Sequence, residues 1–112
     1  MKYYHNPRCR KSREGLSILE EKGVSPEVIL YLKNHITKVE LIDIINKLNI
    51  QPIDLVRKSE SIYKEKYKDS SLTKEQHINM MLENPILIER PIFINGDKGI
   101  VGRPPEKVLE II

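Results

Sequence analysis

The chain has 112 residues, of which 39% are hydrophobic and 31% charged, a balance that is ordinary for one globular domain. Its 19 basic and 16 acidic residues give a net charge of only +3, which does not indicate a nucleic-acid binder but suits a small anionic substrate. Neither a signal-peptide pattern nor an apolar run of about 18 residues is visible. We therefore expect a single cytoplasmic domain over residues 1–112, with no nucleic-acid or membrane partner.

The first third of the chain has the pattern of a strand, a helix and a second strand. Lys2 to Tyr4 is short and β-prone, and Pro7 predicts a turn after it. From Ser12 apolar residues recur at helical spacing until Lys22-Gly23, a basic last turn with a glycine C-cap. The apolar run Val28 to Leu32 then predicts a buried parallel strand. Together these segments predict a right-handed βαβ unit.

Helical signals dominate the middle of the chain. Thr37 and Thr73 each stand three residues before a Glu or Gln, the spacing of a capping box, and apolar residues recur at helical spacing behind both. Asp69-Ser70-Ser71 predicts a break between these helical segments. We therefore expect an all-helical insertion over roughly residues 34–84.

The last third returns to β-structure. Ile92 to Ile94 predicts a strand, and Gly99 to Val101 predicts its antiparallel partner, with a tight turn at Asn95-Gly96 or at Asp97-Lys98. Pro104 to Ile112 has the composition of a final helix, because proline is tolerated in a first turn. The expected fold class is therefore α/β, with a four-stranded mixed sheet flanked by helices.

Cys9 is the only cysteine, and it stands where the first helix is expected to begin. Positive charge surrounds it in the sequence: the neighbours are His5, Arg8, Arg10, Lys11 and Arg13. A helix N-terminus and nearby cations both favour a thiolate, so we expect the pKa of Cys9 to lie below the free value of about 8.5. The alternative is a buried cysteine that acts as a small hydrophobic residue.

The residue counts also limit the chemistry. A single cysteine permits no internal disulfide, so a redox cycle through Cys9 needs a second thiol from outside the chain. The histidines His5, His35 and His77 have no metal-ligand spacing with Cys9 or with one another. We therefore expect no metal and no bound cofactor.

Three separated motifs carry a resemblance that covers essentially the whole chain. They are His5-Asn6-Pro7-Arg8-Cys9, Leu87-Ile88-Glu89-Arg90-Pro91 and Gly102-Arg103-Pro104-Pro105-Glu106. With these motifs in this order, the sequence closely resembles the glutaredoxin-coupled arsenate reductase family. The resemblance implies a thioredoxin/glutaredoxin-like fold in which Pro91 is a cis-proline next to the cysteine.

The same resemblance implies a set of roles. Cys9 would be the nucleophile, Arg57, Arg90 and Arg103 would bind arsenate or a similar oxyanion, and His5 would tune the thiol. Glutathione would be the co-substrate and glutaredoxin the protein partner, in arsenic detoxification. Arginine suits such a site on physical grounds, since its planar fork of N–H donors matches an oxyanion better than lysine does.

Other interpretations stay open at several of these residues. Each arginine could instead pair with a neighbouring acid, as Arg57 with Asp54 or Glu60, and His5 could be only a polar residue at a strand end. The roles of Arg10 and Lys11 are also open, because the family commonly has small residues after its nucleophile. A different function, that of a protein-binding transcriptional regulator of the Spx type, would use the same fold without arsenate turnover.

Ser12 helps to decide between the arsenate reductase and the Spx-type regulator. It occupies the position of the second cysteine of a CxxC motif, which argues against a dithiol oxidoreductase and against Spx-type regulators, since these often carry CxxC. Its hydroxyl could still cap the helix or donate to the thiolate.

Overall fold

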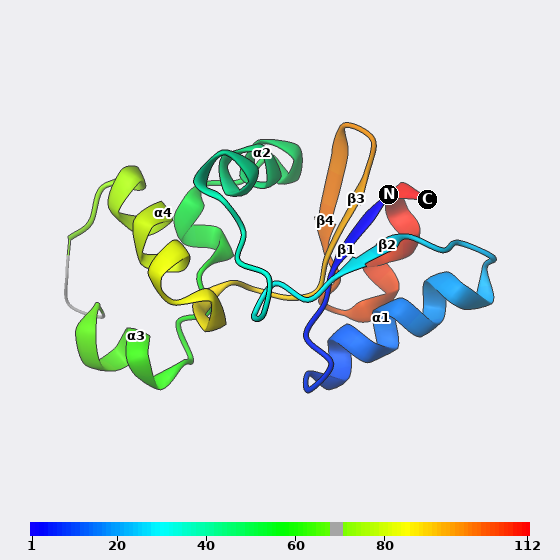
Figure 1. Cartoon of the computed structure of the whole chain (residues 1–112), viewed down its shortest axis with the longest axis horizontal. Coiled ribbons are helices and arrows are strands. Elements are labelled where there is room, and N and C mark those ends of the chain that lie inside the picture. Colours follow the sequence, from blue (N-terminus) through cyan, green and yellow to red (C-terminus); the bar gives the residue numbers. More distant parts are fainter. Residues whose placement is uncertain (68–70) are drawn as a thin grey trace. The chain divides into compact units, whose positions relative to one another are not determined.

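The computed structural model describes residues 1–67 and 71–112, and these form two compact units (Figure 1). The first unit combines Met1–Asn34 with Arg90–Ile112, and the second consists of His35–Glu89. Residues 69 and 70 of the predicted break lie outside the described residues. Within the described parts, no helix is both long enough and apolar enough to cross a membrane.

A four-stranded mixed sheet organises the first unit. Its strands are β1 (Lys2–Tyr4), β2 (Glu27–Ile29), β3 (Ile92–Asn95) and β4 (Lys98–Val101). They lie in the order β2-β1-β3-β4, with β1 parallel to β2 and every other pair antiparallel. The predicted fold class is therefore confirmed, and β1 is a central strand although it has only three residues.

The prediction of a buried second strand was wrong in its burial and length. β2 covers only Glu27–Ile29 and forms one edge of the sheet, so that Val28 remains 44% exposed. The parallel pairing with β1 is as predicted. A short apolar run cannot distinguish an edge strand from a central one, because both pack apolar side chains against their neighbours.

Helix α1 (Arg10–Glu21) follows β1 and begins two residues earlier than predicted. It ends as predicted, with Gly23 at a φ of +74° just past Lys22, a backbone conformation that glycine adopts without strain. The predicted last helix is present as the 3₁₀ helix η3 (Pro105–Ile111), which lies beside α1 in Figure 1.

Both helices pack on the same hydrophobic core of the first unit. This core is centred on four buried side chains from four elements: Tyr3, Leu19, Phe93 and Val108. Tyr3 and Phe93 are register partners on β1 and β3, so they share one face of the sheet, and Leu19 and Val108 reach them from α1 and η3. The core therefore holds α1 and η3 against the same face of the sheet.

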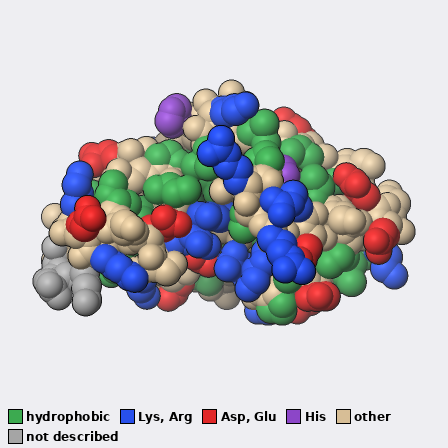
Figure 2. All heavy atoms as spheres, turned by 90° about the horizontal axis from the view of Figure 1, so that it is seen from below, with side chains coloured by type: hydrophobic (Ala, Val, Ile, Leu, Met, Phe, Trp, Pro, Cys, Tyr) green, Lys and Arg blue, Asp and Glu red, His purple; other side chains and the backbone are tan. Residues whose placement is uncertain are grey.

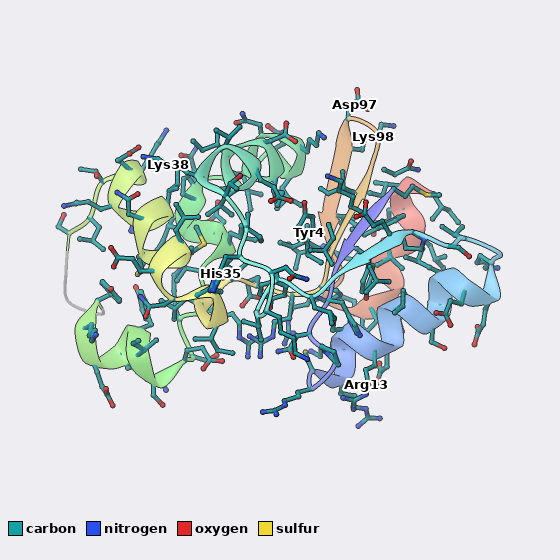
Figure 3. All side chains as sticks on the ribbon, viewed as in Figure 1. Tyr4, Arg13, His35, Lys38, Asp97 and Lys98 are labelled. Atoms are coloured by element: carbon teal, nitrogen blue, oxygen red, sulfur yellow. The ribbon has the colours of Figure 1, made fainter. Side chains whose placement is uncertain are left out.

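The antiparallel hairpin between β3 and β4 confirms the prediction, with a shift of one residue in its turn. Asn95 pairs with Lys98, which makes Gly96-Asp97 the two-residue turn. Gly96 has a φ of +65°, as the first central residue of a tight hairpin turn of the II′ type requires. Asp97 and Lys98 lie at the tip in Figure 3, away from the core.

The second unit is built from helices, as the sequence predicts. They are α2 (Lys38–Leu48), η1 (Pro52–Leu55), α3 (Ser61–Lys66), α4 (Lys74–Glu83) and η2 (Pro85–Leu87). Both predicted caps are present, because Thr37 and Thr73 each accept a hydrogen bond at 3.2 Å from the backbone N–H three residues later. Basic and acidic side chains are both present on the surface in Figure 2, in line with the small net charge.

Candidate active site

Cys9 is the N-cap residue of α1, with extended backbone angles and a half-buried side chain. The loop before it is held by short-range hydrogen bonds. The Cys9 N–H donates to the Asn6 carbonyl at 3.0 Å, and the Arg8 N–H donates to the Asn6 side-chain oxygen at 3.1 Å. An N-cap side chain lies close to the first N–H groups of its helix, which have no acceptor within the helix. The fold thus places the thiol where a negative charge is stabilised.

The electrostatics of the site favour the thiolate. Burial raises the pKa of the Cys9 thiol, but the Ser12 backbone N–H, the Arg90 guanidinium and the Lys11 backbone N–H together outweigh it. The pKa therefore lies below its ordinary value, in the direction that the sequence predicts.

The source of this shift agrees only in part with the sequence-based argument, because the helix N-terminus contributes as expected whereas two of the neighbouring cations bind other groups. Arg10 forms an ion pair with Glu14 at 2.7 Å, and Arg13 donates to the Pro7 carbonyl at 2.8 Å. Arg13 lies at the start of α1 in Figure 3. These two neighbouring cations are thus turned to local partners, and the pKa of the thiol is lowered mainly by two backbone N–H groups and by Arg90, which is distant in sequence.

Arg90 and Arg103 meet at the thiol although they are far from it in sequence. The Nη1 of Arg103 lies 3.9 Å from the Cys9 sulfur and donates to the Arg90 carbonyl at 3.1 Å. Arg90 is only 8% exposed. Two positively charged guanidinium groups beside a thiolate form an environment that suits an oxyanion.

Proline and glycine backbone features hold these two arginines together. The Arg90-Pro91 and Arg103-Pro104 peptide bonds are both cis, which confirms the expectation for Pro91. The Gly102 N–H donates to the Pro91 carbonyl at 2.9 Å. A Cβ atom on Gly102 would lie 2.8 Å from the Pro91 ring, so the two segments approach as closely as a glycine allows.

Behind the thiol lies a buried polar network around Ser12. The Ser12 Oγ lies 2.6 Å from the Nδ1 of His5 and accepts a hydrogen bond from the Asn6 N–H at 3.0 Å. Burial, and then the positive charge of Arg13, lower the pKa of His5, so a neutral imidazole is favoured. A neutral His5 can position the loop through Ser12, and the tuning role that the resemblance implies stays a prediction.

Sequence reasoning missed two members of this network. Asn6 is buried and bonds both Arg8 and Cys9, and Tyr3 donates from its hydroxyl to the Ser12 carbonyl at 2.6 Å. For Asn6 a signal was available, since asparagine often closes a turn by bonding the backbone two residues on. Tyr3 gives no such signal, because its role depends on the packing of α1 against β1.

Arg57 belongs to the second unit and has two acidic neighbours there. Its Nε lies 3.3 Å from Glu60, and its Nη1 lies 3.7 Å from Glu89. The pairing with Glu60 is one of the alternatives that the sequence left open. The Arg57 backbone N–H donates to the Leu87 carbonyl, which joins the segments on either side of α3 and α4. Its oxyanion-binding role stays a prediction.

No metal centre is present among residues 1–67 and 71–112, since no three His, Cys, Asp or Glu side chains gather there as ligands. His5 is in the first unit and hydrogen-bonds to Ser12, whereas His35 is in the second unit.

Comparison with known proteins places the chain in a family. A model of the ArsC family matches residues 4–111. The chain belongs to the ArsC family. It is 45% identical over 111 residues to an arsenate reductase of Haemophilus influenzae, with 97% of this chain and 96% of that protein covered. It is 48% identical over 114 residues to the uncharacterized protein YfgD of Escherichia coli, with 100% and 96% covered.

Solved structures agree with this assignment to the ArsC family. An arsenate reductase from Vibrio cholerae superposes with a TM-score of 0.94 at 41% identity, covering 100% of this chain and 98% of that one. The thioredoxin-like fold and the family resemblance that the three sequence motifs carry are therefore confirmed.

Proposed function

We propose that this protein is an arsenate reductase whose nucleophile is the Cys9 thiolate. The observation that carries the proposal is the thiol at the N-terminus of α1, with Arg103 at 3.9 Å and Arg90 lowering the thiol pKa. Its similarity over nearly its full length to proteins named arsenate reductase supports the choice of oxyanion. Arg90 and Arg103 would bind the arsenate oxygens, and the family resemblance implies the same role for Arg57.

The first step is a condensation. The Cys9 thiolate attacks arsenic, an S–As bond forms, and an As–OH group leaves as water after it takes up a proton. Arsenic stays in oxidation state V during this step, so no electrons are transferred. The positive charge of Arg90 and Arg103 would offset the negative charge that builds up on the arsenate oxygens.

The second step is the reduction. A glutathione thiolate attacks the Cys9 sulfur, an S–S bond forms, and the S–As electron pair remains on arsenic, which leaves as arsenite in oxidation state III. Glutaredoxin would then reduce the mixed disulfide on Cys9, because the chain contains no second cysteine. Such a cycle fits the cytoplasm, where a glutathione pool keeps thiols reduced.

A coupled assay of the purified protein with arsenate, glutathione and glutaredoxin tests this proposal. We expect arsenite formation that depends on all three additions and that is lost in Cys9→Ser. Serine is close to cysteine in size at a half-buried position, so this variant should keep its fold, which circular dichroism checks. Absence of arsenite with a folded wild-type protein would reject the enzyme and favour a protein-binding role, which pulldown with RNA polymerase subunits would test.

A further inference from the structure

Tyr3 connects the central strand β1 to the first turn of α1, the helix that begins at the thiol. Its side chain is 0% exposed, and its hydroxyl donates to the Ser12 carbonyl at 2.6 Å. The Leu16 backbone N–H donates toward the same hydroxyl oxygen. In a regular α-helix the Leu16 N–H bonds to the Ser12 carbonyl. The tyrosine hydroxyl therefore lies at the pair of backbone groups that closes this turn of the helix.

Tyr3 can hold these groups in place because it is itself fixed. β1 is paired on both sides, and Tyr3 faces Val28 on β2 and Phe93 on β3. The rings of Tyr3 and Phe93 pack with their centroids 6.4 Å apart. Gly15 leaves room for the hydroxyl, since a Cβ atom there would lie 2.5 Å from its oxygen. A tyrosine side chain has only two torsions, so a packed ring places its hydroxyl with little freedom.

Ser12 carries the effect of that hydroxyl to the nucleophile. Ser12 is 0% exposed, and its backbone N–H stabilises the Cys9 thiolate. Its side-chain Oγ is held by His5 at 2.6 Å and by the Asn6 N–H at 3.0 Å, while Tyr3 holds its carbonyl. A movement of the carbonyl would turn the N–H of the same residue relative to the sulfur. A hydrogen bond weakens steeply when its angle departs from linear, so the placement of Ser12 matters for the thiolate.

Tyr3 adds no charge to the site. Burial, and to a smaller extent the Cys9 thiolate, raise the pKa of the Tyr3 hydroxyl, so it stays a neutral donor while a thiol titrates. Tyr3→Phe therefore removes one hydrogen-bonding oxygen and leaves the charged and titratable groups around the thiol in place. These groups are His5, Arg8, Arg10, Lys11, Arg13, Arg90 and Arg103.

We propose that Tyr3 is a positioning residue for the nucleophile: its hydroxyl holds the first turn of α1 so that the Ser12 N–H is directed at the Cys9 sulfur. The Tyr3 side chain is fully buried, so it acts through Ser12 and makes no contact with the substrate. The consequence for catalysis rests on the proposed reductase function, whereas the effect on the thiol can be measured without arsenate.

The thiol is measured first, through the rate of iodoacetamide alkylation against pH. In Tyr3→Phe the midpoint should rise by about half a unit or more, because the thiolate keeps a less well directed hydrogen bond. Leu19→Val is the control, since it trims the same core from α1 but leaves the Tyr3 hydroxyl bonded, and its midpoint should not change. Circular dichroism checks that both variants are folded. An unchanged midpoint in Tyr3→Phe, or an equal rise in Leu19→Val, would overturn the positioning role.

Gly15→Ala tests the same hydroxyl while the tyrosine stays. The added Cβ must displace the hydroxyl, so the midpoint should rise in this variant too. In the Tyr3→Phe background that Cβ would lie 3.6 Å from the nearest ring carbon, an ordinary contact, and should raise the midpoint clearly less. If the two rises simply added in the double variant, the hydroxyl would not be their common cause and the proposal would be overturned.

Turnover is measured last. In Tyr3→Phe the acidic limb of the pH profile of kcat/KM for arsenate should move to higher pH by about the alkylation shift. The KM for arsenate at a pH above this limb should stay within about twofold of the wild-type value. An unmoved limb beside a shifted alkylation midpoint would overturn the role in turnover. If Tyr3→Phe shifted the alkylation midpoint but the wild-type protein formed no arsenite, the proposed function would fail while the positioning of the thiol stood.

Discussion

At the scale of single residues, the reactivity of Cys9 depends on groups that a count of charged side chains along the local sequence does not reveal. The Ser12 and Lys11 N–H groups act because Cys9 is an N-cap, and Arg90 acts because the fold brings it from the other end of the chain. The adjacent Arg10 and Arg13 bind local partners instead. Charge count along a sequence therefore gave the correct direction of the pKa shift for a partly incorrect reason.

The pKa of Cys9 is directly measurable. The rate of alkylation by iodoacetamide, followed against pH, should have its midpoint below the free value of about 8.5. Arg90→Ala should raise this midpoint, because it removes a hydrogen bond and a positive charge from the thiolate. Arg10→Ala should change it little, since Glu14 already neutralises Arg10. A wild-type midpoint at or above about 8.5 would contradict the thiolate site.

The three arginines that the resemblance assigns to oxyanion binding should affect kcat/KM for arsenate more strongly than the other cations near Cys9 do. Arg57→Ala, Arg90→Ala and Arg103→Ala should each lower kcat/KM for arsenate by roughly ten- to a hundredfold, since a charge-assisted contact contributes about 1.5 to 3 kcal/mol. Lysine replacements should cost less, because they keep the charge. Arg8→Ala and Arg13→Ala are the controls and should have smaller effects on arsenate. Equal losses in all five variants would indicate diffuse attraction.

His5 should make stability depend on pH. Its pKa is lowered in the folded protein, so between about pH 6.5 and the folded value the unfolded chain binds more protons. The contribution of His5 to the free energy of unfolding should therefore be constant above about pH 6.5 and fall as the pH falls below it. Urea unfolding between pH 5 and 8 measures this slope. His5→Asn should reduce it, whereas His35→Asn, at an exposed position, should keep it.

At the scale of elements, the start of α1 is fixed by a close contact with β1. A Cβ atom on Gly15 would lie 2.5 Å from the Tyr3 hydroxyl oxygen, and that hydroxyl donates to the Ser12 carbonyl in the first turn of α1. A glycine in a helix interior normally costs stability, so its presence here has a packing reason. The contact keeps Ser12 and Cys9 at the end of β1.

Because of this contact, we expect that replacing the helical Gly15 with alanine destabilises the protein, whereas the same replacement in most helices stabilises it. Gly15→Ala should lower the free energy of unfolding by about 1 to 3 kcal/mol, although alanine favours helices, because the Tyr3 hydroxyl must move. Removing that hydroxyl relieves the clash, so the same substitution in Tyr3→Phe should cost clearly less. Urea unfolding of the four proteins measures the difference. An equal cost in both backgrounds would show that the hydroxyl is not the obstacle.

Elements with a local signal were predictable, and those without one were not. The caps at Thr37 and Thr73 and the glycine after α1 depend on residues a few positions apart, and all three are found. The edge position of β2 depends on which strands pair in the sheet. The sequence also could not show that η3 is a 3₁₀ helix, because the spacing of its apolar residues fits both a 3₁₀ helix and an α-helix.

At the scale of the whole molecule, the site is made by long-range contacts that only the family resemblance could indicate. Arg103 reaches the Cys9 sulfur across 94 positions of sequence, and no periodicity or local charge pattern predicts that approach. The resemblance also identified Pro91 as a cis-proline. It did not indicate that two glutamates flank Arg57, because the position of Glu89 beside it depends on the packing of the second unit.

The whole-chain cysteine count leads to a prediction about turnover. With one cysteine, the mixed disulfide formed in the second step has no internal thiol to resolve it. With arsenate and glutathione but without glutaredoxin, we expect a rapid burst of about one arsenite per chain and then a much slower phase, because the partner expected to reduce the mixed disulfide is absent and the chain has no resolving thiol of its own.

Intact mass spectrometry at the end of the burst should show one glutathione attached, less two hydrogen atoms. Addition of glutaredoxin should remove the adduct and restore turnover. Cys9→Ser is the control and should show neither burst nor adduct. Sustained turnover at the full rate without glutaredoxin would mean that glutathione alone resolves Cys9, and the glutaredoxin step would then be wrong even though the reductase activity stood.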